Sequence, residues 1–397
     1  MLLLFYILVL QQVAQGFLSL WSGWKWLGMV RDRLATYSGF YAPRVALICP
    51  CKGDEPGLEG NLTALLHFDY ANYEVFFVLA SALDPARPVI DRVCSSKQKT
   101  THVIVAGAPK GRGEKVNNLR TAVQEIGDPF EVFVFVDSDS RLGRGWLAHM
   151  VAPLADPKIG AASTYRWFFP NQGGFASDML SAWNAAIVTQ MGEKGRNFCW
   201  GGGTSIRREI FHRAQVLEAW EGAVSDDWTL TAALERAALP ILFVPECLAP
   251  TVSDADFEQL LEFTNRQLIL TRVYSPRRWA VAALAHLSYC LTLGFAAFAI
   301  LDRMFTGDTW AGMLLLTLLI TLLAGMKGAL RAIAVQDILR EWRSKTESLS
   351  WIWIVFAPLV PFLFLWNFII SAFERRIRWR GVKYELVSPT QTRVLSH

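Results

Sequence analysis

The chain has 397 residues, of which 52% are hydrophobic and only 19% are charged, and it contains 16 Trp. A soluble enzyme of this size usually carries more charge, so we expect part of the chain to face lipid. The 39 basic and 35 acidic residues give a net charge of +4, which is too balanced for a nucleic-acid-binding protein. The six cysteines and six histidines lack the spacing of a disulfide framework or a zinc site.

The N-terminal residues 1–22 are predicted to form a transmembrane anchor. Met1–Leu20 is an apolar run broken only by glutamines, and a bilayer core needs about 20 such residues. A cleaved signal peptide is the alternative, but the run lacks a basic start and a small-x-small cleavage site. Tryptophans and cationic residues follow the run, a pattern that places the next segment in the cytoplasm.

Residues 41–275 have the character of a soluble α/β domain. Four short apolar runs predict strands, and a helical pattern through Leu58–Leu66 follows the first of them; the runs are Val45–Cys49, Glu74–Leu79, His102–Val105 and Glu131–Val136. Such alternation predicts a Rossmann-like, mostly parallel sheet covered on both faces. Ligands on these sheets bind at the carboxyl ends of the strands, where the polar clusters of this sequence occur.

Residues 279–373 are predicted to form a membrane region of two or three hydrophobic segments. Trp279–Leu301 and Trp310–Met326 are uninterrupted, whereas two prolines break Trp351–Phe373. The basic tail 374–397 belongs in the cytoplasm by the positive-inside rule. Three crossings would leave that tail outside, so one segment should be re-entrant or interfacial. We expect this to be the proline-broken segment, because irregular backbone at membrane depth needs protein cover.

The triplet Asp137-Ser138-Asp139 directly follows the fourth predicted strand. Two carboxylates at positions i and i+2 can hold a divalent cation, and oxygen ligands suit Mg²⁺ or Mn²⁺ bridging to substrate phosphates. The same triplet also occurs in ordinary acidic loops. Its place at the end of a buried strand favours the metal site.

A second acidic pair, Asp226-Asp227, precedes an apolar helical pattern. Ser225 and Asp226 both suit the N-cap of that helix, which is the structural interpretation. The functional interpretation is a general base, Asp227, with a neighbouring carboxylate that raises its proton affinity. The two interpretations are compatible within one short segment.

Two further segments are candidates for ligand contact. In Gly201–Thr204, the glycines Gly202 and Gly203 allow close backbone approach and Thr204 offers a hydroxyl, although a plain turn is the alternative. In the loop 110–118, Lys115 supplies charge and Asn118 helps to open a helix. The sequence contains no GxGxxG fingerprint and no P-loop motif, which disfavours dinucleotide-dependent redox chemistry and P-loop hydrolysis.

Taken together and in this order, these stretches resemble the family 2-like glycosyltransferases, most closely the ceramide glucosyltransferase branch. The matching segments are CPCKGDEPGLEGNLTALLHFDYANYEV, GRGEKVNNL, FVDSDS, GGGTSIRREIF, SDDW and WRGVKYEL. They cover most of residues 45–275 and part of the tail. A hydrophobic N-terminal anchor and a hydrophobic C-terminal region match the same architecture.

The resemblance implies a GT-A fold and transfer, with inversion, of a sugar from a nucleotide-sugar donor, usually UDP-linked, to a lipid hydroxyl. By position, Asp137 and Asp139 would hold a divalent cation on the diphosphate. Asp227 would take the proton from the acceptor hydroxyl, with Asp226 beside it, and Lys52 and Lys115 would contact the nucleotide. The expected location is a membrane, with the catalytic domain on its cytoplasmic side, as in a bacterial inner membrane.

The chain departs from the pattern of that family at two binding positions. The family has an aspartate for the nucleotide base where this chain has Ser81, and Asp84 is the expected substitute. The family's QxxRW motif aligns with residues 259–263, which keep Gln259 but replace the arginine by Glu262. Arg266, one helical turn further on, is expected to replace the lost charge.

The sequence indicates the identity of the acceptor less clearly than that of the donor. Residues 183–197 contain no counterpart of the histidine that ceramide-using members carry, so the resemblance implies a lipid acceptor without identifying it as ceramide. The aromatic run 165–169 would line an acceptor groove or pack in the core.

Three other functions compete with this hypothesis. A processive polysaccharide synthase would retain QxxRW and more membrane spans. A catalytically silent scaffold is favoured by Ser81 and Glu262, but the retained acidic pairs argue against it, because buried acids without a ligand are costly. A nucleotidyl- or phosphotransferase could use the same metal site without needing an acidic base such as Asp227.

Overall fold

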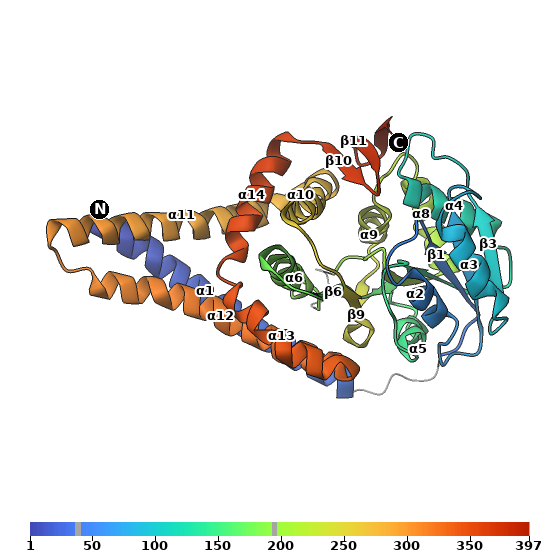
Figure 1. Ribbon diagram of the computed structural model, residues 1–397, viewed down its shortest axis with the longest axis horizontal. Helices are drawn as coiled ribbons and strands as arrows, with labels where there is room; N and C mark the ends of the chain where they lie inside the picture. The colour runs from blue at the N-terminus through green and yellow to red at the C-terminus, as the bar shows by residue number, and fades with distance from the viewer. Residues whose placement is uncertain (36–40, 193–196, 397) are drawn as a thin grey trace.

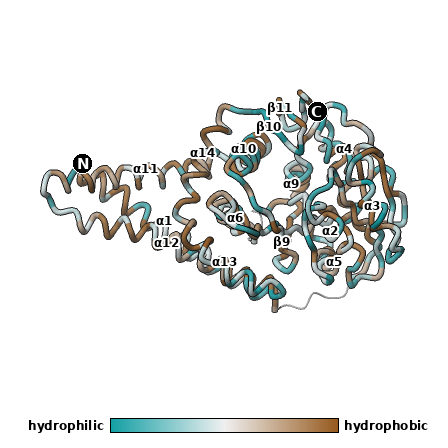
Figure 2. Tube along the Cα trace, in the orientation of Figure 1, coloured by the Kyte–Doolittle hydropathy of each residue, from teal (hydrophilic) through white to brown (hydrophobic). Residues whose placement is uncertain are grey.

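The computed structural model describes residues 1–35, 41–192 and 197–396. A sheet domain forms one end of the molecule, and an arm of three long helices forms the other (Figure 1). The arm contains α1 (Leu2–Ala35), α11 (Pro276–Thr306) and α12 (Ala311–Ile338). Its colouring in Figure 2 is mostly that of hydrophobic residues, whereas the sheet domain carries hydrophilic loops.

A seven-stranded sheet organises the α/β domain, with strand order β3-β2-β1-β4-β7-β5-β8. Its strands are β1 (Val45–Pro50), β2 (Tyr73–Leu79), β3 (Thr101–Val105), β4 (Val132–Val136), β5 (Ala161–Ser163), β7 (Gly203–Arg207) and β8 (Ile241–Phe243). β1 to β4 pair in parallel, as do β5 and β8, whereas β7 runs antiparallel to both of its neighbours. The mostly parallel sheet predicted from the sequence is therefore confirmed.

Helices cover both faces of this sheet, which explains why its strands are apolar on successive residues. Leu47 packs into the core on one face and Ile48 into the core on the other, as the alternation of a strand requires. The covering helices are α2 (Leu58–Leu65), α3 (Ala86–Ser95), α4 (Glu114–Glu125), α5 (Trp146–Val151), α7 (Arg208–Arg213), α8 (Val216–Ala219) and α9 (Asp226–Arg236). Short 3₁₀ turns occur at Ala152–Ala155, Pro245–Cys247 and Arg340–Trp342.

A second layer joins the sheet domain to the arm. It contains the parallel strands β6 (Arg166–Phe169) and β9 (Ala249–Val252) and the helices α6 (Phe175–Val188) and α10 (Phe257–Tyr274). Trp167 is 1% exposed, and its ring centroid lies 4.9 Å from that of Trp353. Most of the predicted aromatic run 165–169 therefore packs in the core, while Phe168 reaches the cavity described below.

Within residues 1–35, 41–192 and 197–396, three helices, α1, α11 and α12, are long and apolar enough to cross a membrane. α1 continues beyond the predicted anchor 1–22, because its last turns, including Trp26 and Val30, are buried against the rest of the protein. The last hydrophobic segment divides into α13 (Arg343–Val355) and α14 (Val360–Phe373), which meet at 69°. Of the two prolines noted in the sequence, Pro358 lies in the break and Pro361 is the second residue of α14.

The basic C-terminal segment is folded onto the α/β domain. It forms an antiparallel sheet of β10 (Arg376–Trp379), β11 (Val382–Ser388) and β12 (Gln391–Ser396), and the last residue of the predicted tail lies outside the described residues. Its inner side chains share a core with Val224 and Ile269. Because this sheet and the α/β domain must lie on one side of a membrane, an even number of crossings separates them. α11 and α12 supply two, which favours a re-entrant or interfacial α13–α14 pair.

Candidate active site

A cavity of about 1230 Å³ opens at the carboxyl ends of β1 and β4. Its walls come from the loop after β1, the start of α4, β6, α10 and the hairpin β10–β11. Seven of the residues predicted from the sequence line it: Lys52, Lys115, Asn118, Asp137, Asp139, Gln259 and Arg266. The topology of the sheet, which gathers strand ends at one edge, brings these distant positions together.

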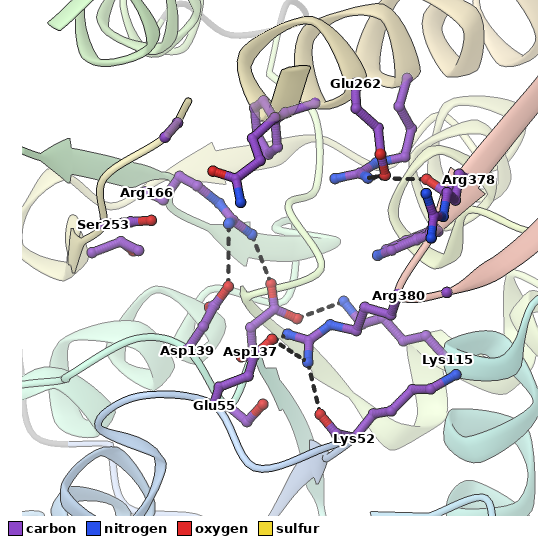
Figure 3. Close-up of a pocket in the computed structure, with 18 of the residues that line it drawn as sticks. Lys52, Glu55, Lys115, Asp137, Asp139, Arg166, Ser253, Glu262, Arg378 and Arg380 are labelled. Carbon is purple, nitrogen blue, oxygen red and sulfur yellow. Dashed lines mark hydrogen bonds and ion pairs between the residues drawn. The ribbon is translucent and has the colours of Figure 1, made fainter. Parts of the chain in front are cut away.

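The two carboxylates of the Asp-Ser-Asp triplet are held by two cations (Figure 3). Oδ1 of Asp137 lies 2.7 Å from Nζ of Lys115, and its Oδ2 lies 2.9 Å from Nη2 of Arg166. Arg166 also reaches Asp139, at 3.4 Å. Burial alone would raise the pKa of Asp137, but Lys115 and Arg166 outweigh burial and hold that pKa below its usual value. Asp137 is therefore ionised at neutral pH.

The donor atoms of this triplet suit a hard divalent cation, although the described residues provide no ready-made cage. Among them, no three His, Cys, Asp or Glu side chains gather closely enough to hold a metal ion. Mg²⁺ and Mn²⁺ sites in nucleotide-dependent enzymes often use only one or two carboxylates, with phosphates and water completing the shell. Asp137 and Asp139 fit that pattern, with Arg166 bound to both of them in this structure.

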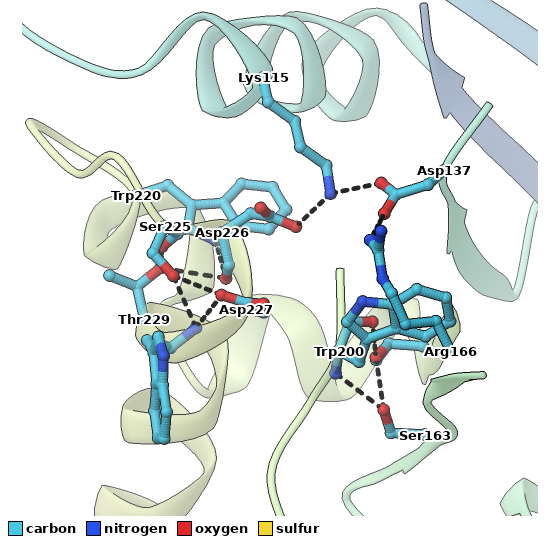
Figure 4. Close-up of polar contacts among 12 residues, drawn as sticks. Lys115, Asp137, Ser163, Arg166, Trp200, Trp220, Ser225, Asp226, Asp227 and Thr229 are labelled. Atoms are coloured by element: carbon cyan, nitrogen blue, oxygen red, sulfur yellow. Dashed lines mark hydrogen bonds and ion pairs between the residues drawn. The ribbon is translucent and has the colours of Figure 1, made fainter. Parts of the chain in front are cut away.

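Lys115 links the triplet to the second acidic pair (Figure 4). Its Nζ lies 3.4 Å from Oδ2 of Asp226, whose side chain is 4% exposed. Burial raises the pKa of Asp226 to about 7; Lys115 opposes this effect, and the charges of Asp227 and Asp137 add to it. Asp226 is therefore partly protonated near neutral pH, unlike Asp137.

Asp227 is the less buried member of the pair. Its Oδ1 accepts hydrogen bonds from the Ser225 hydroxyl and, at 2.7 Å, from the Trp228 amide, while no hydrogen bond from the described residues reaches its Oδ2. Ser225 is the N-cap of α9 and also accepts from the Trp228 amide. The capping interpretation thus applies to Ser225. Neither carboxylate of the pair lines the cavity itself, and the pair is connected to it through the contact of Asp226 with Lys115.

The predicted ligand-contact segment Gly201–Thr204 packs against buried side chains of the α/β domain. A Cβ atom on Gly202 would lie 2.6 Å from Oδ2 of Asp137, and one on Gly203 would lie 2.6 Å from Thr164. Thr204 belongs to β7, and its buried hydroxyl is bonded to Ser163 and to the Trp200 carbonyl. None of these three predicted residues lines the cavity. The glycines instead make room for the side chains of Asp137, Thr164 and Trp200.

Asp84 and Gln259 have structural partners. Oδ1 of Asp84 accepts from the Gly53 amide at 2.8 Å and from the Ala86 amide at 2.9 Å, which ties the loop after β1 to the start of α3. Asp84 lies outside the cavity lining. Gln259 forms a capping box with Asp256 at the start of α10 while also lining the cavity.

Several cavity residues were absent from the sequence-based set: Glu55, Arg166, Arg378, Arg380 and Tyr384. Arg166 stands within the aromatic run, whose packing gave no reason to single it out. Arg378 and Arg380 were assigned to a basic tail. The signal for a strand was present in that tail, since apolar and charged residues alternate along Val382–Leu386.

A mostly parallel α/β sheet with an Asp-Ser-Asp triplet at one strand end and an acidic pair facing it is the arrangement of a GT-A glycosyltransferase. The chain belongs to glycosyl transferase family 21, whose model matches residues 4–392. It is also 30% identical to a ceramide glucosyltransferase of Gibberella zeae over 177 residues, which cover 41% of this chain and 32% of that protein. The chain therefore aligns with about a third of that relative.

The fold is similar to that of a solved archaeal enzyme. Mannosyltransferase PcManGT from Pyrobaculum calidifontis, in complex with GDP-Man and Mn²⁺, superposes with a TM-score of 0.50 at 18% identity. The match covers 89% of this chain and 98% of that one. At this coverage the match extends beyond the α/β domain, and it confirms the predicted fold class.

Proposed function

We propose that this glycosyltransferase moves a sugar, with inversion, from a nucleotide-sugar to a hydroxyl of a membrane lipid. The observation that carries the proposal is the Lys115 bridge, which joins the triplet at Asp137 to the acidic pair at Asp226 beside one cavity. The family supports glycosyl transfer, and the similarity to the ceramide glucosyltransferase of Gibberella zeae supports a lipid acceptor. A UDP-hexose is the expected donor, and a ceramide-like or other lipid is the expected acceptor.

On the donor side, Lys52 and Lys115 would contact the diphosphate. Asp137 and Asp139 would hold a divalent cation, which would supply Lewis-acid stabilisation of the departing nucleotide diphosphate. Lys115 would hold the acidic pair at a fixed position relative to the donor site, because it already contacts both Asp137 and Asp226.

On the acceptor side, Asp227 would remove the proton of the lipid hydroxyl as its oxygen attacks the anomeric carbon. The Ser225 and Trp228 donors fix one carboxylate oxygen and leave the other for this task. A base in this role contributes about 10²- to 10⁴-fold in rate. Asp226, partly protonated near pH 7, would limit the negative charge next to the base.

The lipid would reach this base from the membrane side of the cavity. Phe168, Leu180 and Phe263 line that wall, and they come from β6, α6 and α10. α10 leads directly into α11, one of the helices able to span a membrane. This placement supports a membrane-bound enzyme, and the basic segments around the catalytic domain support its cytoplasmic location, as in a bacterial inner membrane.

The test is sugar transfer by the full-length protein in detergent with mixed membrane lipids. A panel of UDP- and GDP-sugars would be supplied with Mn²⁺ or with EDTA, and lipid products would be separated by mass. Metal-dependent formation of a lipid carrying one sugar would support the proposal, and the nucleotide-sugar that gives this product would be identified as the donor. Long polysaccharide products would identify a processive synthase, and the absence of any turnover or donor binding would favour the silent scaffold.

A further inference from the structure

The turn of the C-terminal hairpin projects an arginine into the cavity. β10 and β11 are joined by the two residues Arg380 and Gly381, with φ values of 46° and 84°. Two positive φ values define the primed hairpin turn in which Asn-Gly is the usual sequence. A large side chain such as arginine is strained at the first position. Strain of this kind at a cavity wall points to a function for the side chain that occupies it.

Arg380 makes its contacts on the donor side of the cavity (Figure 3). Its Nη1 lies 3.0 Å from the carbonyl oxygen of Lys52 and 2.8 Å from Oε1 of Glu55. Both partners belong to the loop after β1, at the strand end where the nucleotide is expected. Burial raises the pKa of Glu55, although Arg380 opposes that effect. Nη2 of Arg380 also donates to Oε2 of Glu55 at 3.2 Å, so Glu55 occupies the guanidinium face that a phosphate would take.

A second guanidinium, that of Arg266, lines the same cavity as Arg380. The side chain of Arg266 is 14% exposed, and its nearest carboxylate, on Glu262, is 4.0 Å away. Its guanidinium lies 5.3 Å from the ring centroid of Phe263 and 5.6 Å from that of Trp379, and it donates to the Arg378 carbonyl. Burial lowers the pKa of Arg266 to about 10; Glu262 opposes this effect, whereas the charges of Arg166 and Arg380 reinforce it. Arg266 is therefore a mostly buried cation whose carboxylate partner, Glu262, lies at the limit of an ion pair.

We infer that Arg380 and Arg266 form a clamp for the diphosphate of the donor, so that the C-terminal hairpin completes the donor site. The inference rests on the proposed function, since it needs a nucleotide-sugar. A guanidinium binds phosphate oxygens through two parallel hydrogen bonds, and a diphosphate supplies oxygens to two such groups. A lipid headgroup is a weaker candidate, because Arg380 contacts Lys52 and Glu55 and not the apolar wall of α6.

The hairpin is fixed firmly enough to serve as a wall of the site. The Tyr384 hydroxyl accepts a hydrogen bond at 3.2 Å from the amide of Glu114, the residue before Lys115. Tyr384 and Leu386 are buried in a core shared with Val224, which lies directly before Ser225. The hairpin thus contacts both the helix that carries Lys115 and the segment that carries the acidic pair.

The experiment replaces Arg380 with glycine, the residue that the turn conformation favours. Arg380→Gly relieves backbone strain, so its Tm should equal or exceed that of the wild type. Binding of the nucleoside diphosphate would be measured by calorimetry on the full chain in detergent, and binding of the monophosphate in parallel. We expect the diphosphate to bind about 10- to 100-fold more weakly, as for a lost charge-assisted hydrogen bond. The monophosphate should change by less than about threefold, because it offers the clamp one phosphate only.

Arg376→Ala is the matched control, because Arg376 is 67% exposed on the same hairpin and pairs with Glu385 on its outer side. The control should bind both nucleotides like the wild type. Equal diphosphate affinity in Arg380→Gly and the wild type would overturn the clamp while leaving the proposed function intact. A wild type that binds no nucleoside diphosphate would overturn both. A lowered Tm with equal losses for both nucleotides would assign Arg380 a purely structural role.

Discussion

The ammonium group of Lys115 lies 3.4 Å from Oδ2 of Asp226. This contact joins the first turn of α4 to the first residue of α9, and the same ammonium also pairs with Asp137. Burial lowers the proton affinity of Lys115, but the surrounding carboxylates outweigh burial and raise its pKa. Lys115 is therefore a permanent cation, and its loss would leave two buried acids facing each other.

Replacing Lys115 with methionine should destabilise the protein by about 3–5 kcal/mol, the usual cost of removing one partner from a buried ion pair. Thermal unfolding in detergent measures the effect, with the exposed Lys158→Met as control. The double variant Lys115→Met/Asp226→Asn should recover part of the lost Tm, because the second change removes one uncompensated acid. A double variant less stable than Lys115→Met would contradict this electrostatic account.

Asp226 should make stability depend on pH. Its pKa rises from about 3.9 in the unfolded chain to about 7 in the folded protein, so the folded state binds more protons between these values. Its contribution to the free energy of unfolding is therefore fully present below about pH 4 and falls as the pH rises to about 7. The difference in Tm between wild type and Asp226→Asn, followed from pH 5 to pH 9, should shift in favour of the variant. A difference independent of pH would show that Asp226 is already ionised at pH 5.

Gly202→Ala should impair the site without unfolding the protein. The added methyl would lie 2.6 Å from Oδ2 of Asp137, so the carboxylate or the Trp200 ring must move, at a cost of about 1–3 kcal/mol. We expect a loss of at least tenfold in transfer rate, together with a lower affinity for Mn²⁺ and donor. Gly127→Ala, where nothing lies within 4 Å of the new methyl, should behave like the wild type. Full activity in Gly202→Ala would show that the site tolerates displacement of Asp137.

Arg166→Gln tests the charge balance of the triplet. Arg166 neutralises Asp137 and Asp139 together, so its removal should increase the affinity of the triplet for Mn²⁺ in the absence of donor. Electron paramagnetic resonance of free Mn²⁺ measures this affinity directly. Unchanged or weaker Mn²⁺ binding would indicate that the cation and the guanidinium do not compete for these carboxylates.

The parts of the fold that were predicted are those that depend on local sequence. The strands β1 to β4 were placed within one residue at each end, because buried parallel strands are continuous apolar runs. The strands β5 and β8 have three residues each, too few for a periodic pattern. β7 has the sequence GTSIR, whose first residues were interpreted as a ligand-contact segment, with a plain turn as the alternative. Its antiparallel pairing with β4 depends on tertiary contacts.

The candidate site was also predicted only in part, because several of its residues are brought together by tertiary contacts that local sequence does not indicate. Motif residues such as Asp137 and Asp227 carry a local signature, whereas Arg166 gains its role from carboxylates 27 and 29 residues away in sequence. Arg380 is more than 300 residues from its partner Lys52. Only the folded hairpin brings it to the cavity, since the turn sequence Arg-Gly is not the usual Asn-Gly signal.

The central claim, that Asp227 is the base of a sugar transfer to lipid, is tested most directly by comparing donor binding with transfer in Asp227→Asn. Asparagine keeps the size of the side chain and its contact with Trp228 but cannot take a proton. We predict that the variant binds the donor like the wild type while transfer falls about 10²- to 10⁴-fold, and that the exposed Asp91→Asn is unaffected in both. Transfer at the wild-type rate by Asp227→Asn, with the donor bound normally, would contradict the account.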